Sequence, residues 1–199
     1  MKLIFKRTLF YILSFTWGAI MTAIGLVVLL VTLPFGKFGI YHGRIYKEIG
    51  KNWGGVELGC FFLCDEGAWE STKEHESGHG LQNCIWGPLM PFVICIPSAT
   101  RYWIFEQKDF KHKKKFVLMI SLIATVTSLL LSLIPILTNN MWLFFIPGIL
   151  LTYTIIWFLW LWFIELPKHN KIPRVGYYDI WFEDQASKWG EKYVATDKI

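Results

Sequence analysis

Three long runs without a charged residue constrain this chain of 199 residues more than any other feature. They cover residues 8–35, 116–137 and 141–164, and each is long enough for the helix of about 20 residues that crosses the hydrocarbon core of a bilayer. The composition agrees, because only 18% of the residues are charged, against about 25% in soluble domains. We therefore expect a mainly α-helical, multi-spanning membrane protein with about three spans.

The first run has an alternative interpretation as a secretory signal, because Lys6 and Arg7 precede it. It is about twice as long as the apolar region of such a signal and lacks a small-x-small cleavage site, so we predict a retained anchor. A fourth uncharged stretch, residues 80–100, contains three prolines. Proline interrupts a helix, which predicts a broken segment that is re-entrant or lies in the membrane.

The polar stretches between these runs predict smaller elements. Residues 36–64 combine strand-forming side chains with a glycine-rich turn and predict a small β-hairpin. Residues 72–86 predict a helix, with Ser71 as N-cap, Glu74 completing a capping box, and Gly87 ending it. A last helix is expected over residues 180–193, and residues 1–199 are expected to form a single membrane-embedded domain.

The cysteines and the net charge give no indication of a zinc ribbon or of a nucleic-acid-binding protein. None of the four cysteines has the Cys-x-x-Cys spacing of a zinc ribbon, which favours small buried thiols. The net charge of +5 is ordinary for a membrane protein, whose basic residues gather on the cytoplasmic side. Nothing in the sequence predicts binding to nucleic acid.

One short motif in the predicted helix carries chemistry. The residues from His75 to His79 read His-Glu-Ser-Gly-His and fit the pattern His-Glu-x-x-His. Residues four apart share a helix face, so both imidazoles can bind one Zn²⁺ ion. Glu76 lies beside them, where a carboxylate can take a proton from water whose pKa the metal lowers. The alternative is a pair of ordinary polar histidines, but Gly78 would then cost helix stability without a purpose.

A catalytic zinc requires a third protein ligand from elsewhere in the chain. Our candidate is Glu183, which shares a helix face with the small residues Ala186 and Gly190 and could pack closely against the first helix. Asp179 and Asp184 are rival ligands, and a surface carboxylate without a metal is the simplest alternative for Glu183.

At these positions the sequence resembles the integral-membrane gluzincin peptidases, which include the CAAX prenyl endopeptidase and the HtpX protease. In that family a His-Glu-x-x-His helix is completed by a second helix of the form Glu-x-x-Ala-Asp. Residues 183–186 match this form, whereas Ser187 stands in place of the aspartate. The resemblance implies a zinc site made of His75, His79 and Glu183, with Glu76 as general base. The serine is expected to weaken the orientation of a histidine ligand.

The sequence also resembles two other groups of proteins. The glycine of His-Glu-x-Gly-His is common in site-two proteases, which cut within the membrane, but their Leu-Asp-Gly-like motif is absent here. The wider chain also resembles a family of bacterial membrane proteins without an assigned activity, at residues 54–56 and 96–98.

The distribution of Lys and Arg predicts the orientation in a bacterial cytoplasmic membrane. Six lie in residues 101–115 and six follow residue 164, whereas none lies in residues 138–140. The short loop should face outward, and the site and C-terminus should face the cytoplasm. Residues 80–100 must then not cross the membrane, and three basic residues before the first span lie on the disfavoured side.

These observations predict a membrane-bound zinc metalloprotease acting on a membrane or membrane-proximal protein, with the hairpin offering an edge strand to the substrate. A non-catalytic scaffold or binding protein with a structural metal is the main alternative. A transporter is less favoured, since no long run contains an ionisable residue. The sequence does not rank the candidates for the group that stabilises the transition state, which are His42, Arg101, Tyr177, Tyr178 and Tyr193.

Overall fold

The computed structural model describes residues 2–171, 176 and 178–197. This described part is mainly helical, with a small sheet, and divides into two compact units, Met1–Ile96 with Tyr178–Ile199, and Pro97–Tyr177. The elements of the first unit are α1 (Lys2–Phe15), α2 (Ala19–Val31), β1 (Lys37–Tyr41), β2 (Arg44–Glu48), β3 (Gly55–Leu58), β4 (Phe61–Cys64), α3 (Glu70–Trp86), η1 (Gly87–Leu89), η2 (Pro91–Cys95) and α9 (Trp181–Asp197).

The first predicted span, residues 8–35, is two short helices rather than one. Ile4–Phe15 and Ala19–Val31 are bent by 87° at the break, and each helix is shorter than the roughly 20 residues that a straight span needs. The break accommodates a tertiary contact, since a Cβ at Gly18 would lie 2.3 Å from Nδ2 of Asn83 on α3. α1 and α2 nevertheless bury apolar side chains against strand β4, with Phe10 and Leu29 beside Phe61.

The predicted hairpin of residues 36–64 is instead a four-stranded sheet in the order β1-β2-β4-β3 within the described residues. β1 and β2 are antiparallel, β2 and β4 parallel, and β3 and β4 antiparallel, so two hairpins are joined side by side. The first hairpin turns at His42 and Gly43, which have φ values of 46° and 82°. Positive φ at both central residues is typical of a type I′ turn, which Asn, Asp or Gly usually occupies, so the turn at His42 was missed.

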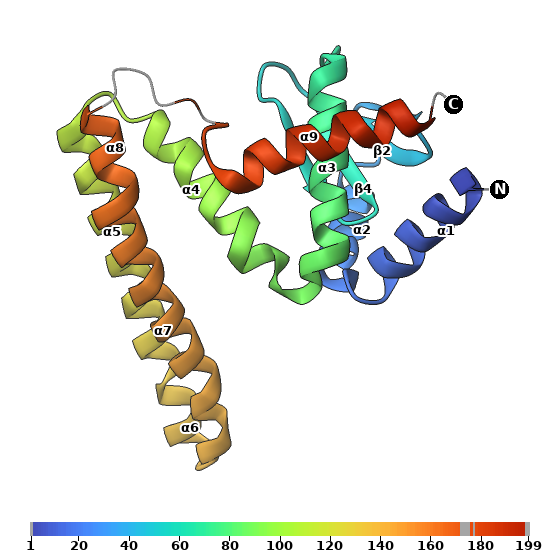
Figure 1. Ribbon diagram of the computed structural model, residues 1–199. Coiled ribbons are helices and arrows are strands. Elements are labelled where there is room, and N and C mark those ends of the chain that lie inside the picture. The colour runs from blue at the N-terminus through green and yellow to red at the C-terminus, as the bar shows by residue number, and fades with distance from the viewer. Residues whose placement is uncertain (1, 172–175, 177, 198–199) are drawn as a thin grey trace. The chain divides into compact units, whose positions relative to one another are not determined.

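α3 and α9 complete the first unit, and α9 lies across α3 (Figure 1). α3 begins at Glu70, about one residue before the predicted N-cap Ser71, and Trp69 is the actual N-cap. The start is fixed by the sheet, because Tyr41 Oη donates a hydrogen bond of 2.7 Å to the Glu70 carboxylate. The predicted end is confirmed at Gly87, which has a φ of 49°.

The prediction of a broken segment at residues 80–100 is also confirmed. Glu70–Leu89 and Pro91–Phe105 are bent by 114° at a short break. The bend shows that the segment is broken, and its re-entrant or membrane-lying placement stays a prediction. All four cysteines are free, with Cys60 and Cys64 buried and Cys84 and Cys95 half-buried.

The second unit contains the two long apolar helices. Its elements are α4 (Ile96–Phe105), α5 (Phe110–Leu131), α6 (Leu133–Leu137), η3 (Met141–Phe144), α7 (Phe145–Trp160), η4 (Leu161–Glu165) and α8 (Leu166–Lys171). Phe110–Leu137 and Met141–His169, of 28 and 29 residues, are long and apolar enough to cross a membrane and contain the predicted spans 116–137 and 141–164. α5 and α7 run side by side (Figure 1).

Both long helices leave most of their apolar side chains exposed, which is consistent with helices that face lipid. Where the helices meet, Ile104, Val117 and Leu161 are fully buried. Next to this core lies a buried ion pair, with Arg101 Nε 2.5 Å from the Glu165 carboxylate. The second long helix, Met141–His169, therefore contains an ionisable side chain near its end, beyond the uncharged run of residues 141–164.

Candidate metal centre

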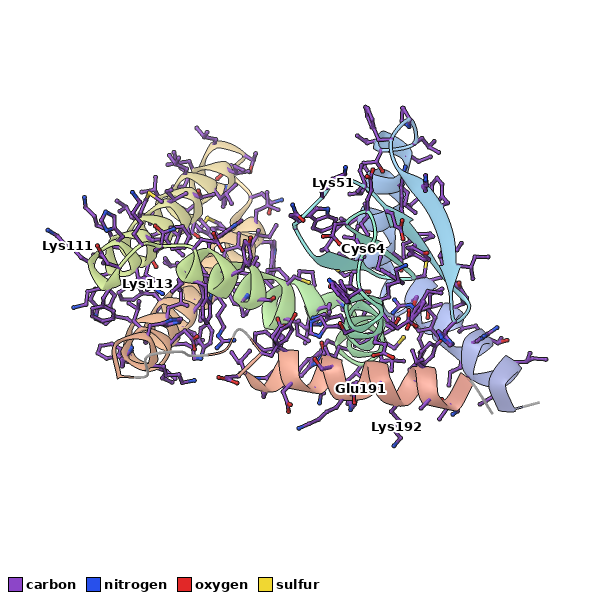
Figure 2. All side chains as sticks on the ribbon, turned by 90° about the horizontal axis from the view of Figure 1, so that it is seen from above. Lys51, Cys64, Lys111, Lys113, Glu191 and Lys192 are labelled. Carbon is purple, nitrogen blue, oxygen red and sulfur yellow. The ribbon has the colours of Figure 1, made fainter. Side chains whose placement is uncertain are left out.

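The site is built where α3 and α9 approach each other unusually closely. A Cβ at Gly78 would lie 1.8 Å from the carbonyl oxygen of Ala186, and one at Gly190 would lie 1.8 Å from that of Glu74. Glycine at both positions therefore lets the two backbones come into direct contact, as the small residues in the sequence led us to expect. Figure 2 views this crossing from above, with Lys192 projecting from the side of α9 that faces away from α3.

Three potential metal ligands converge at this crossing, as predicted. Nε2 of His75 lies 3.0 Å from Oε2 of Glu183, Nε2 of His79 lies 3.3 Å from the same oxygen, and the two nitrogens are 3.0 Å apart. Glu183 is fully buried and both histidines are nearly so. A tetrahedral zinc with ligands at about 2.0–2.1 Å would separate its ligand atoms by roughly 3.3 Å, so the spacing fits such an ion.

The tautomer of His79 follows from its hydrogen-bonded neighbour Gln82. Gln82 Nε2 donates to the carbonyl oxygen of Phe182 at 2.7 Å, and a carbonyl can only accept. Gln82 Oε1 must therefore be the atom 2.7 Å from Nδ1 of His79, and it accepts a proton from that nitrogen. With the proton on Nδ1, neutral His79 directs the lone pair of Nε2 toward His75 and Glu183.

Ser187 has the same effect on His75. The Ser187 hydroxyl donates to the carbonyl oxygen of Glu183 at 3.2 Å, and its oxygen lies 2.9 Å from Nδ1 of His75, from which it accepts. The serine that departs from the family pattern thus occupies the orienting position of the aspartate. A hydroxyl can accept the Nδ1 proton as a carboxylate can, so His75 has an orienting partner, and the expectation that serine orients it more weakly than aspartate stays a prediction.

Two nitrogen lone pairs and a carboxylate oxygen pointing at one another repel unless a cation lies between them. The donor set of two imidazoles and one carboxylate is the one that zinc prefers in hydrolytic sites. The residues present therefore fit a divalent metal. In a metal-free chain a proton takes that role: burial disfavours protonated His79, but the hydrogen bond and charge of Glu183 outweigh it and raise its pKa to about 9.

Comparison of the chain with models of protein families, with curated proteins and with solved structures finds no match. Function is therefore inferred from the geometry of the site.

Glu76 lies beside the three ligands in a dry environment. It is 5% exposed, and burial raises its pKa above the ordinary value although the charges of His79 and His75 oppose this. Its side chain lies over strand β3, where a Cβ at Gly55 would be 2.7 Å from Cγ of Glu76. A carboxylate with a raised pKa is a stronger base near neutral pH, as the predicted role requires.

Arg44 is a structural residue of the site that sequence analysis did not single out. Its guanidinium is buried beneath α3 and donates to the carbonyl oxygens of Glu76 and Gly59, both at 3.1 Å. A Cβ at Gly80 would lie 2.0 Å from Nη2 of Arg44, so this glycine makes room for the guanidinium. An arginine on a short strand gives no sequence signal of such burial, whereas Gln82 could have been found as the residue three positions after His79.

The residues considered for stabilising the transition state lie in different parts of the structure. The ring centroid of Tyr178 lies 5.1 Å from that of His75, which places this phenol at the site. Tyr193 Oη donates instead to the carbonyl oxygen of His42. Arg101 is paired with Glu165 in the second unit, and Tyr177 lies outside the described residues.

The rival ligands do not join the cluster. Asp184 is exposed and ion-paired with Lys188 at 2.6 Å. Asp179 is exposed as well, and among the described residues the group that could hold a metal contains neither aspartate.

Proposed function

We propose that this protein is a membrane-bound zinc metallopeptidase. The observation that carries the proposal is the convergence of His75, His79 and Glu183, with both histidine tautomers set by neighbours so that three lone pairs point to one place. Glu76 lies next to that place and is buried. The arrangement matches the one expected from the resemblance to integral-membrane gluzincin peptidases.

The chemistry divides between the metal and the chain. Bound zinc would polarise the peptide carbonyl and lower the pKa of water. Glu76 accepts a proton from the attacking water and delivers it to the leaving nitrogen, so that the hydroxyl joins the acyl carbon as the amide bond breaks. His75, His79 and Glu183 hold the ion, while Ser187 and Gln82 keep the imidazoles in the required tautomer.

Two further features support peptide substrates. β3 is an end strand of the sheet and lies against Glu76, so an extended peptide can add to its open edge next to the general base. Tyr178 is the candidate for stabilising the negative charge that develops on the carbonyl oxygen, because its ring contacts His75. Burial raises the pKa of Tyr178, which keeps the phenol protonated and able to donate.

Chain continuity and the basic residues support the proposed orientation. Two spans separate α4 from α9, and an even number of crossings returns the chain to the side on which it started. Since α3 and α9 are in contact, we infer that the bent pair Glu70–Leu89 and Pro91–Phe105 does not cross the membrane. The basic run of residues 111–115 favours the cytoplasmic side for the site and the C-terminus.

Zinc content tests the centre directly. The full chain, purified in detergent and supplied with zinc, is compared with His75→Ala, Glu183→Ala, Glu76→Gln and the exposed control Asp184→Ala by elemental analysis. We expect about one zinc per chain in the wild type, Glu76→Gln and Asp184→Ala, and loss in the two ligand variants. A wild type without zinc refutes the proposal.

Hydrolysis of a fluorogenic peptide library then separates the two functions that a metal at this crossing can serve. The ion also ties α9 to α3, as a structural metal in a scaffold would. Cleavage by wild type that is lost in Glu76→Gln, with zinc retained, supports the peptidase. Full zinc content without cleavage of any library member favours the scaffold.

A further inference from the structure

A second buried carboxylate, Glu57, lies beside the metal centre and has no role in the hydrolysis described above. Gly55 and Glu57 are two residues apart on β3, so they face the same side of the sheet. That side lies against α3, since Gly55 contacts the side chain of Glu76. The charges of His79 and Glu76 both act on the Glu57 carboxylate, which places it within the electrostatic field of the centre.

Glu57 is unusual because no side chain in the described residues donates a hydrogen bond to it. The residue is 4% exposed, and the backbone of Gly59 is the group that favours its charge through a hydrogen bond. Nearby Arg44 directs its two terminal nitrogens to the carbonyl oxygens of Glu76 and Gly59 instead. Burial raises the pKa of Glu57 to about 8 despite the opposing charge of Arg44. No side chain of the described residues is hydrogen-bonded to this carboxyl group, so it can accept a hydrogen bond from a cation that a ligand brings.

The two ends of β3 differ in how far they are covered. Val56 is 42% exposed, whereas Leu58 is 7% exposed. α2 covers the strand at its far end, where a Cβ at Gly25 would lie 2.4 Å from the carbonyl oxygen of Leu58. A peptide that adds along β3 can therefore pair with its open half but meets α2 near Leu58, so one terminus of the peptide comes to lie near Glu57.

We propose that Glu57 binds the protonated N-terminal amine of the substrate, so that the centre acts as an aminopeptidase. Below about pH 8 Glu57 holds a proton in the free chain. An N-terminal ammonium can take the place of that proton and pair with the carboxylate, whereas a C-terminal carboxylate is repelled. Water adds across an amide close to the N-terminus and releases an amino acid or a short N-terminal peptide. This inference rests on the proposed peptidase function.

Peptide binding to a chain that cannot hydrolyse tests the assignment independently of activity. The probe is a neutral apolar hexapeptide with a fluorophore at its C-terminus, prepared with a free N-terminus, with an acetylated N-terminus, and acetylated with lysine in first position. Fluorescence anisotropy measures its Kd for the full, zinc-supplied Glu76→Gln chain in detergent. We expect the free amine to bind about tenfold or more tightly than the acetylated peptide.

The same titrations on two double variants locate the charge that recognises the amine. Addition of Glu57→Gln should reduce the difference between free and acetylated peptide to about twofold or less. Addition of Glu66→Gln, which removes an exposed carboxylate from the same unit, should leave the difference unchanged. Should the Glu57→Gln variant not fold, the comparison of free and acetylated peptide on the Glu76→Gln chain still decides.

Each outcome bears on one of the two proposals. Equal binding of free and acetylated peptide overturns the assignment of Glu57, and so does tight binding of the acetylated lysine peptide, which would identify a side-chain amine as the ligand. Wild-type cleavage of free and acetylated peptides at equal rates leaves a peptidase without this specificity. Binding that depends on the N-terminal amine, without cleavage by wild type, supports the role of Glu57 and refutes the peptidase.

Discussion

Gln82→Met should weaken zinc binding and the α3–α9 crossing together, because one fully buried side chain serves both. Methionine has nearly the same length but neither accepts strongly nor donates. The change removes the acceptor for Nδ1 of His79 at 2.7 Å and the donor to the carbonyl oxygen of Phe182 at 2.7 Å. It also removes the donor to Oε1 of Gln185 at 3.0 Å.

The expected magnitude follows from the groups left without partners. The Nδ1–H of His79 and the carbonyl of Phe182 become buried and unsatisfied, at a cost of about 1–3 kcal/mol each. The free energy of unfolding should therefore fall by about 2–6 kcal/mol. Loss of the group that orients a histidine ligand typically lowers metal affinity by about 10–100-fold, so the Kd for zinc should rise by that factor.

Two measurements check this on the full chain in detergent. Competition with a chromophoric chelator gives the Kd for zinc, and thermal unfolding with and without zinc gives the stability. Gln107→Met is the matched control, since Gln107 makes an exposed hydrogen bond to Trp103 in the second unit. A Kd for zinc within about twofold of wild type in Gln82→Met would show that Gln82 does not set the tautomer of His79.

Four further outcomes are expected. Gly78→Ala should lower the free energy of unfolding by about 3 kcal/mol and abolish zinc binding, because its methyl would overlap the carbonyl of Ala186; unchanged thermal unfolding would contradict the close approach. Tyr178→Phe should lower kcat about 100-fold with zinc content unchanged, and an effect on KM alone would exclude a role in the transition state. Ser187→Ala should weaken zinc binding about tenfold and Ser187→Asp should restore it, as chelator competition can test. In the metal-free chain burial raises the pKa of Glu57 to about 8, so between about pH 4.5 and 8 the native state keeps a proton that the unfolded state has lost. The free energy of unfolding should therefore fall as pH rises, by on the order of 1.4 kcal/mol per pH unit. Glu57→Gln should flatten this slope in thermal unfolding, and equal slopes in variant and wild type would refute the raised pKa.

The metal ligands were the most predictable part of the site. His75 and His79 follow from helical periodicity, and Glu183 follows from the small residues on its own helix face, since both rules are local. The tautomers were not predictable in this way. Ser187 acts on His75 through a hydrogen bond that exists only once α3 and α9 have met. Gln82 lies on the same helix as His79, but the orientation of its amide depends on the carbonyl of Phe182 in α9.

Two elements have a different form from the one expected. The uncharged run of residues 8–35 has the length and composition of a straight span, but Asn83 fits against Gly18 and a sharp bend results. The hairpin was divided differently because His42 adopts a positive φ, which is uncommon for residues other than glycine. A contact between distant segments produces the bend, and the backbone conformation of one residue places the turn; periodicity within a segment carries no information on either.

The order of the candidate metal ligands along the sequence has a consequence for the synthesis of the protein. The ligands of the metal centre come from α3 and α9, and the whole second unit, Pro97–Tyr177, is synthesised between them. A ribosome must therefore deliver both long apolar helices before the last ligand, Glu183, emerges. A nascent or prematurely ended chain has His75 and His79 but no complete ligand set, so the proposed activity would arise only after both long apolar helices have been synthesised.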